Sequence, residues 1–207
     1  MRGSLLILSV VVLAGCGPKP YIGTGPAAQH QDVSFRAVST KLEFLSGESV
    51  RLAGYVKNEG KRLATILVDL EPRLGVKCTV ELLGKDGAYT PTLEPPKQRA
   101  ELALDNSSFL VLDPGNESRV TVFDIRSAKG PDGKEGPLPP GTYTAKMRYE
   151  VAAEPASAAG LSFLGDSKKM LSQSPRAVWE NSVEFKVSTE AYKPPSRRPR
   201  GGGPSGG

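Results

Sequence analysis

A two-residue alternation of apolar and polar side chains is the feature that most constrains the fold of this chain. In the clearest run, five apolar residues share one parity: Tyr143, Ala145, Met147, Tyr149 and Val151. Similar runs cover 50–57, 76–82 and 183–187. Such alternation gives each strand one dry and one wet face, as in antiparallel sheets packed face to face. No window of ten residues keeps a helical period, so we predict an all-β domain.

Turn residues divide these runs into short strands. The chain has 23 Gly and 18 Pro among 207 residues, which is too many for a helix bundle. Lys85-Asp86-Gly87 contains the Asp-Gly pair that is typical of a tight hairpin. We therefore expect an all-β, Ig-like antiparallel β-sandwich of seven to nine strands over residues 33–190.

Residues 1–15 have the pattern of a secretory signal peptide. Arg2 precedes an apolar run from Leu5 to Ala14, and a ten-residue helix of about 15 Å is too short to cross a bilayer. The run ends in Leu13-Ala14-Gly15-Cys16, which resembles the lipobox of bacterial lipoproteins. The resemblance implies cleavage before Cys16, which would then carry acyl chains such as palmitate. The alternative is an ordinary signal peptide with a chance cysteine.

The lipobox resemblance also implies a location. Several acyl chains on one residue make a stable bilayer anchor, with the domain facing the periplasm or the cell surface. Gly17 stands where an Asp retains many lipoproteins in the inner membrane, so the outer membrane is favoured if the host has one. Residues 16–32 contain Pro and Gly without apolar periodicity, and we predict a lipidated flexible tether with a reach of roughly 20–24 Å.

The net charge of +5 is not a property of the predicted domain. Arg2 lies in the leader, and four more basic residues lie in the Pro/Gly-rich stretch 191–207, which has no acidic residue. Positions 16–190 contain 22 basic and 22 acidic residues, so their formal charges cancel. A neutral domain argues against a nucleic-acid partner. We expect 191–207 to be a disordered basic tail that is either solvated or in contact with anionic phospholipid or polysaccharide.

Three turn segments have a shared character: Gly47-Glu48-Ser49 before a strand ending at Asn58, the stretch from Leu112 to Ser118, and the stretch from Leu138 to Tyr143. Together they resemble bacterial Ig-like modules, most of all the BsuPI-type proteinase-inhibitor domain. Roughly positions 45–188 are covered. The resemblance implies the Ig-like fold, inhibition of a protease through an exposed loop, and a Tyr143 hydroxyl that bonds back to nearby backbone as in a tyrosine corner.

Nothing in the chain pairs a nucleophile with a base. Cys78 has the apolar parity of its strand, which predicts a buried and inert thiol, and His30, the one histidine, lies in the predicted tether. Asp86, Asp132 and Glu135 fall in predicted turns, without a Cys/His set or an Asp-rich calcium loop. We therefore expect no enzyme activity, no metal, no cofactor and no small-molecule substrate.

A long connection, residues 152–176, separates the strand ending at Val151 from one restarting near Val178. A hairpin would use two to five residues here, and long loops commonly have a function. One hypothesis is a partner-binding loop, with four candidate anchors: Leu161, Phe163, Leu164 and Trp179. The other is that the loop folds back over its own sheet edge, with Trp179 in the core.

Two functions follow from these patterns. The first is a membrane-anchored, non-catalytic lipoprotein that presents a β-sandwich binding or scaffold module to an envelope protein. The alternative is a BsuPI-like proteinase inhibitor that acts through an exposed loop.

Overall fold

The computed structural model describes residues 28–30, 32–70, 72–94, 101–152 and 161–191. The predicted leader, Cys16, most of the predicted tether and residues 192–207 lie outside these ranges. The strands in the described part are β1 (Ala28–His30), β2 (Val33–Ser39), β3 (Glu43–Ser46), β4 (Val50–Asn58), β5 (Ala64–Leu67), β6 (Val76–Gly84), β7 (Gly87–Pro91), β8 (Ala103–Leu104), β9 (Phe109–Leu112), β10 (Glu117–Ile125), β11 (Ala128–Lys129), β12 (Glu135–Gly136), β13 (Gly141–Val151), β14 (Ser162–Phe163) and β15 (Ala177–Ala191). The helices are the 3-10 turns η1 (Pro72–Leu74) and η2 (Asn106–Ser108) and the α-helix α1 (Ser167–Gln173).

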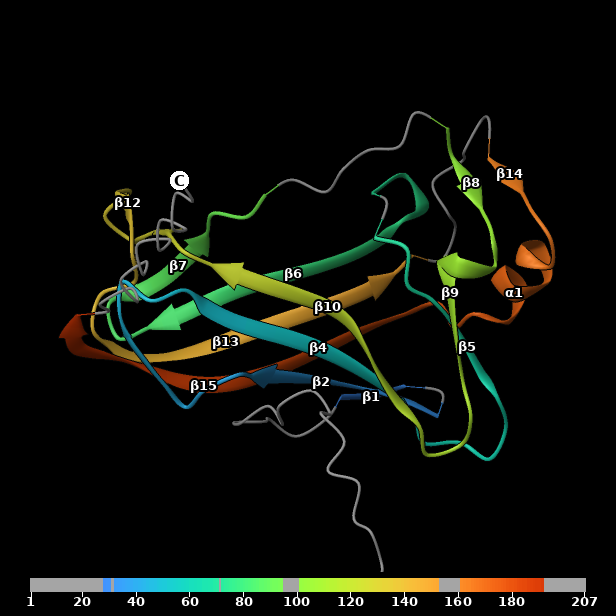
Figure 1. Ribbon diagram of the computed structural model, residues 1–207, viewed down its shortest axis with the longest axis horizontal. Helices are drawn as coiled ribbons and strands as arrows, with labels where there is room; N and C mark the ends of the chain where they lie inside the picture. The colour runs from blue at the N-terminus through green and yellow to red at the C-terminus, as the bar shows by residue number, and fades with distance from the viewer. Residues whose placement is uncertain (1–27, 31, 71, 95–100, 153–160, 192–207) are drawn as a thin grey trace, which may run out of the picture.

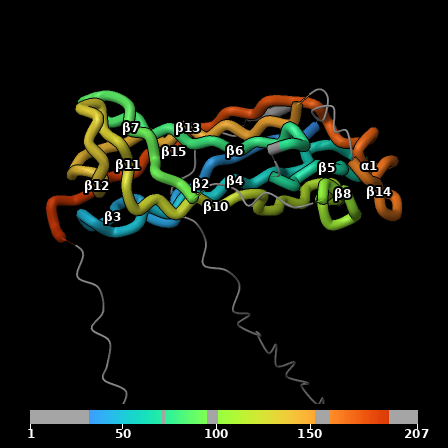
Figure 2. The backbone as a smooth tube through the Cα atoms, turned by 90° about the horizontal axis from the view of Figure 1, so that it is seen from above, coloured from blue at the N-terminus to red at the C-terminus, as the bar shows by residue number. Residues whose placement is uncertain are grey.

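The strands form two packed layers, so the predicted all-β sandwich is confirmed. One sheet has the order β1-β2-β4-β10, and the other has the order β12-β11-β7-β6-β13-β15-β3. Figure 2 shows β6, β13 and β15 in one layer and β2, β4 and β10 in the other. Two small sheets, β5-β9 and β8-β14, lie together with α1 at one end of the molecule (Figure 1). Pairing is antiparallel except between β3 and β15 and between β8 and β14.

The alternating pattern determines the core between the layers. Every second residue of β13, from Tyr143 to Val151, is buried, as predicted. β13 pairs with β15 along its whole length and with β6 on its other side. The Tyr149 ring stacks on Trp179 of β15, with centroids 5.6 Å apart, and on Phe35 of β2, with centroids 5.8 Å apart. This aromatic stack joins the two sheets at the centre of the sandwich.

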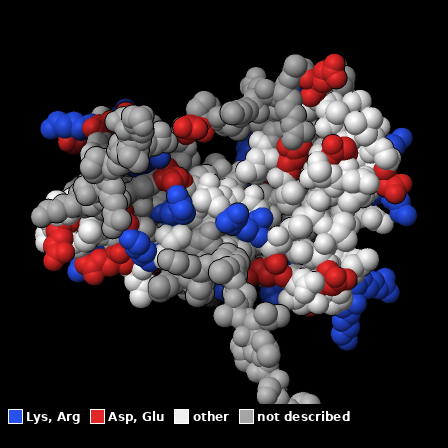
Figure 3. Space-filling model, in the orientation of Figure 1, with Lys and Arg blue, Asp and Glu red and all other residues white. Residues whose placement is uncertain are grey.

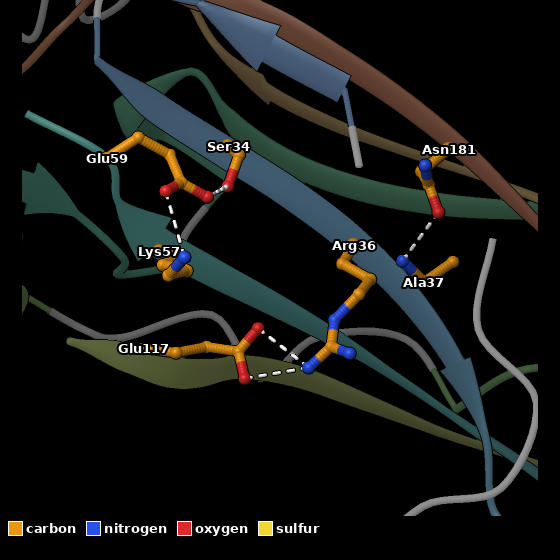
Figure 4. A network of polar contacts seen from close by, with 7 residues as sticks. All are labelled: Ser34, Arg36, Ala37, Lys57, Glu59, Glu117 and Asn181. Carbon is orange, nitrogen blue, oxygen red and sulfur yellow. Dashed lines mark hydrogen bonds and ion pairs between the residues drawn. The ribbon is translucent and has the colours of Figure 1, made fainter. Parts of the chain in front are cut away.

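A buried polar side chain of one sheet satisfies a backbone N–H of the other sheet, beyond the end of its pairing with β1. β1 pairs with β2 only as far as Phe35, so the Ala37 N–H has no partner on that strand. The Asn181 side chain of β15 accepts a hydrogen bond from Ala37 N at 2.8 Å (Figure 4). Because an unpaired buried N–H is costly, this contact explains an amide on the buried face of β15.

Two predicted turn features are confirmed. Gly84 pairs with Gly87 across the β6–β7 hairpin, which leaves Lys85-Asp86 as a two-residue loop. Gly87 has a φ of +129°, a conformation that favours glycine. The Tyr143 hydroxyl donates to Pro139 O at 2.7 Å, which is the contact of a tyrosine corner.

The structure differs from the predicted boundaries at two places. Strand β1 lies within the stretch predicted to be tether, so regular structure begins before residue 33. The predicted loop 152–176 contains β14 and α1 in its described part, while 153–160 lies outside the described residues. Both elements are too short for an alternating or helical pattern to reveal them.

Candidate functional site

The described part of the predicted binding loop is fixed to the end of the sandwich by backbone hydrogen bonds. Strand β14 runs parallel to β8: Ser162 N donates to Leu102 O at 3.0 Å, and Leu164 N donates to Leu104 O at 2.9 Å. Gly165 then turns the chain with a φ of +60° into helix α1. The segment before the helix is therefore held in an extended conformation.

Helix α1 is fixed by its buried side and by the residue that ends it. Leu171 is buried in the core, and Met170 packs against the core while partly exposed. Ser174, the C-cap, bonds its N–H to Met170 O, and its hydroxyl oxygen accepts a hydrogen bond from Leu67 N of β5 at 2.9 Å. The Ser174 side chain thus ties the helix to the neighbouring strand. Ser174 is not among the predicted site residues, and its local signal in the sequence is limited to the Ser-Pro pair at the helix end.

Two of the four candidate anchors lie together at the surface. Phe163 is 38% exposed and Leu164 is 55% exposed, and we name this pair the 163–164 tip. Leu161 instead packs against the core with part of its surface exposed. The described part of the segment thus packs on the molecule and exposes two large apolar side chains, and the partner-binding hypothesis stays a prediction.

Trp179 is wrong as a candidate anchor. It is 1% exposed, and its ring lies in the stack with Tyr149. Its Nε1–H donates to Val33 O at 3.1 Å, so the polar atom is also satisfied inside the protein. The preceding residue, Val178, faces outward and is 44% exposed. Trp179 is therefore a core residue that joins β15 to the start of β2.

Charges of both signs surround the sandwich, and no single-sign field covers the face in Figure 3. On the sheet of β2, β4 and β10, the Arg36 guanidinium reaches both oxygens of Glu117 at 2.8 Å (Figure 4). Beside it, hydrogen bonds from Lys57 and Ser34 lower the pKa of Glu59. Such exposed pairs contribute little stability. A broad uncharged area lies at the end that carries β8, β14 and α1 (Figure 3).

The thiol of Cys78 has the properties of a structural group. Cys78 on β6 packs against the core with part of its surface exposed. Burial raises the pKa of the thiol to about 12, although a hydrogen bond with Thr121 opposes this effect. The thiol is therefore protonated at neutral pH, and a protonated thiol is a poor nucleophile.

The described residues contain no group of three or more His, Cys, Asp and Glu side chains placed for a metal ion. His30 lies in β1 rather than in an irregular tether. Within the described ranges, no helix is long and apolar enough to span a bilayer.

Comparisons with known proteins add little to this geometry. No protein-family model and no curated protein matches the chain. Among solved structures, the β-glucosidase from Listeria innocua in complex with isofagomine has a TM-score of 0.36 and 12% identity, over 77% of this chain and 16% of that one. The same enzyme in complex with glucose has a TM-score of 0.35 and 12% identity, over 77% and 17%. This chain thus spans about a sixth of the length of those enzymes, and at these TM-scores the likeness carries no argument.

Proposed function

We propose that the chain is a membrane-anchored, non-catalytic lipoprotein whose β-sandwich is a binding or scaffold module for another protein of the cell envelope. The observation that carries the proposal is the sequence Leu13-Ala14-Gly15-Cys16 at the end of a ten-residue apolar run, Leu5 to Ala14. Acyl chains on Cys16 would hold the domain at a bilayer, because each buried CH₂ contributes about 0.8 kcal/mol. The domain would face the periplasm or the cell surface, on the outer membrane where the host has one.

The 163–164 tip supports the binding part of the proposal. Phe163 and Leu164 are consecutive residues that each expose a large apolar side chain, and exposed apolar side chains of this kind can anchor interfaces. The backbone bonds to Leu102 and Leu104 hold the tip in place before any partner arrives. A preformed contact loses less entropy on binding than a mobile one.

Exchange of Cys16 for Ser tests the anchor. We expect the parent to remain with the membrane fraction and to incorporate a palmitate analogue, and the Cys16→Ser variant to do neither. A Cys78→Ser variant is the matched control, because it removes the other thiol and should leave labelling unchanged. Equal labelling of the parent and Cys16→Ser would contradict acylation at this position.

Crosslinking in intact cells followed by purification tests the tip. We expect Phe163→Ser and Leu164→Ser each to lose the crosslinked envelope partner while unfolding within about 0.5 kcal/mol of the parent, because both side chains are exposed. Leu42→Ser is the matched control, since Leu42 is 57% exposed and precedes β3 at the other end of the sandwich (Figure 2). Undiminished capture by both tip variants would show that the partner binds elsewhere.

The inhibitor alternative is favoured by one observation. An inhibitory loop has to be exposed, extended and fixed, and β14 has an exposed Phe163 on a backbone paired with β8. A panel of subtilisin-like and trypsin-like proteases separates the two functions. Stoichiometric inhibition that Phe163→Ser abolishes would favour the inhibitor, whereas cleavage of the substrate at an unchanged rate would favour the binding module.

A further inference from the structure

A groove lies at the end of the sandwich opposite the 163–164 tip. It has a volume of about 390 Å³ and is lined by residues of β7, β11 and β12. Three proline rings, of Pro131, Pro137 and Pro139, line it together with Tyr89. We name it the β7–β12 groove. Proline-rich segments dock on apolar ring surfaces, aromatic ones above all, and the proline rings together with the exposed edge of Tyr89 offer a small surface of this kind.

The groove is also acidic. Its lining contains three carboxylates, of Asp86, Asp132 and Glu135, and one ammonium group, of Lys134. Lys134 pairs with Asp132 at 3.5 Å, and both side chains are exposed. The lining therefore has an excess of two negative charges, which favours a basic occupant.

Hydrogen bonds fix the walls of the groove. Oε1 of Glu135 accepts hydrogen bonds from the Thr92 hydroxyl at 2.8 Å and the Ser127 hydroxyl at 3.2 Å. Pro139 is held by the bond from the Tyr143 hydroxyl to its carbonyl oxygen. The site is thus largely preformed, which lowers the cost of binding.

A segment of complementary chemistry follows β15. The stretch 193–200 contains Lys193, Arg197, Arg198 and Arg200, three prolines and no acidic residue. β15 ends at Ala191, at the same end of the molecule as β7 and β12 (Figure 1). Four strand spacings, about 19 Å, separate β15 from β11 in the sheet order. Six residue spacings separate Ala191 from Arg197, and at the polyproline rise of about 3.1 Å per residue that length of chain can reach about 19 Å.

We propose that residues 193–200 dock in cis in the β7–β12 groove, with the arginines paired to its carboxylates and the prolines packed on its rings. Exposed ion pairs are individually weak, but attachment to the same chain supplies a high effective concentration of the ligand. Guanidinium groups suit this role, because their planar forks match carboxylates. The groove would then be occupied by its own chain until a competing basic partner displaces it. The inference does not depend on the membrane anchor.

Amide NMR spectra of the full chain in detergent test the proposal. Gly130 and Gly136 line the groove, and Gly133 lies in the turn between them, so their N–H signals report on its occupant. We expect all three signals to shift in an Arg197→Glu/Arg198→Glu variant and to shift the same way in the parent at high salt. The control variant, Lys168→Glu/Lys169→Glu, makes the same charge change on α1 at the other end and should leave them in place.

Two outcomes would overturn the proposal. Unchanged glycine signals in the Arg197→Glu/Arg198→Glu variant would show that the groove is not occupied by this segment. Signals that move toward the variant's positions when the parent is diluted would show that the segment comes from a second copy rather than from the same chain. A synthetic peptide of residues 192–207, added to the variant, should restore the parent positions.

Discussion

The centre of the sandwich and its β8–β14–α1 end are held in place by different means. β13 and β15 pair through eleven consecutive residues, with an aromatic stack between the sheets. At the end, β14 pairs with β8 through two residues, and α1 has seven residues. The centre therefore depends on extensive burial, and the end depends on a few hydrogen bonds and on three buried leucines, Leu102, Leu104 and Leu171. We expect the end to open without unfolding the centre.

The largest effect is expected at the aromatic stack. Trp179→Ala should lower the free energy of unfolding by about 3–5 kcal/mol, because it leaves a cavity and removes the hydrogen bond to Val33 O. Urea unfolding measures this loss. Val178→Ala, at the exposed neighbouring position, should change stability by less than about 0.5 kcal/mol. Similar values for both variants would contradict the assignment of Trp179 to the core.

A smaller loss is expected where the core closes a sheet edge. Asn181→Ala leaves the buried Ala37 N–H without an acceptor and should lower the free energy of unfolding by about 1–3 kcal/mol. The same urea titration measures it, and Ser182→Ala, one exposed residue further along, is the control. An Asn181→Ala variant with the same free energy of unfolding as the parent would mean that water or a backbone shift satisfies the Ala37 N–H.

Alkaline pH should weaken the centre through Cys78. The folded-state pKa of the thiol is raised from 9.0 to about 12 by burial, so between these values only the unfolded chain releases the proton. Stability is therefore full below pH 9 and falls above it, with a contribution of about 1 kcal/mol from Cys78 at pH 10. Measuring the free energy of unfolding of the parent and of Cys78→Ala at pH 7 and pH 10 isolates the contribution of Cys78. An equal loss in both proteins would refute it.

The smallest loss in the free energy of unfolding is expected at the β8–β14–α1 end. Ser174→Ala removes the acceptor of Leu67 N, but local opening lets water reach that group, so global stability should fall by less than about 1 kcal/mol. Hydrogen exchange should instead accelerate in α1 and at Leu67 and remain unchanged in β13 and β15. If exchange accelerates equally in the centre and the end, the two regions unfold as one unit.

The same contrast explains which elements could be predicted from the sequence. Alternation over 143–151 identified the central strand and its buried face, and the Asp86-Gly87 pair identified the hairpin. The alternation of apolar and polar residues in β15 is harder to recognise in the sequence, because Asn181 interrupts the apolar series that includes Trp179 and Val183. Asn181 faces inward to bond Ala37, a contact 144 residues away along the chain that no local pattern reveals.

The end segment lacked any local pattern of its own. β14 has two residues, so it cannot display alternation, and α1 makes only about two turns. Their positions depend on β8 and β5, which lie far away in the sequence. Loop length alone indicated an unusual feature between Val151 and Val178. The apolar character of Phe163 and Leu164 made them candidate anchors, but the sequence did not show how they are held.

The anchor is the premise of the proposed function, and the intact mass of the protein extracted from membranes tests it most directly. The account predicts a mass above that of the polypeptide beginning at Cys16, by the mass of its acyl chains, with the extra mass confined to the peptide that contains Cys16. The Cys16→Ser variant should lack both the extra mass and the membrane association. A parent protein that weighs no more than its bare polypeptide would contradict the account.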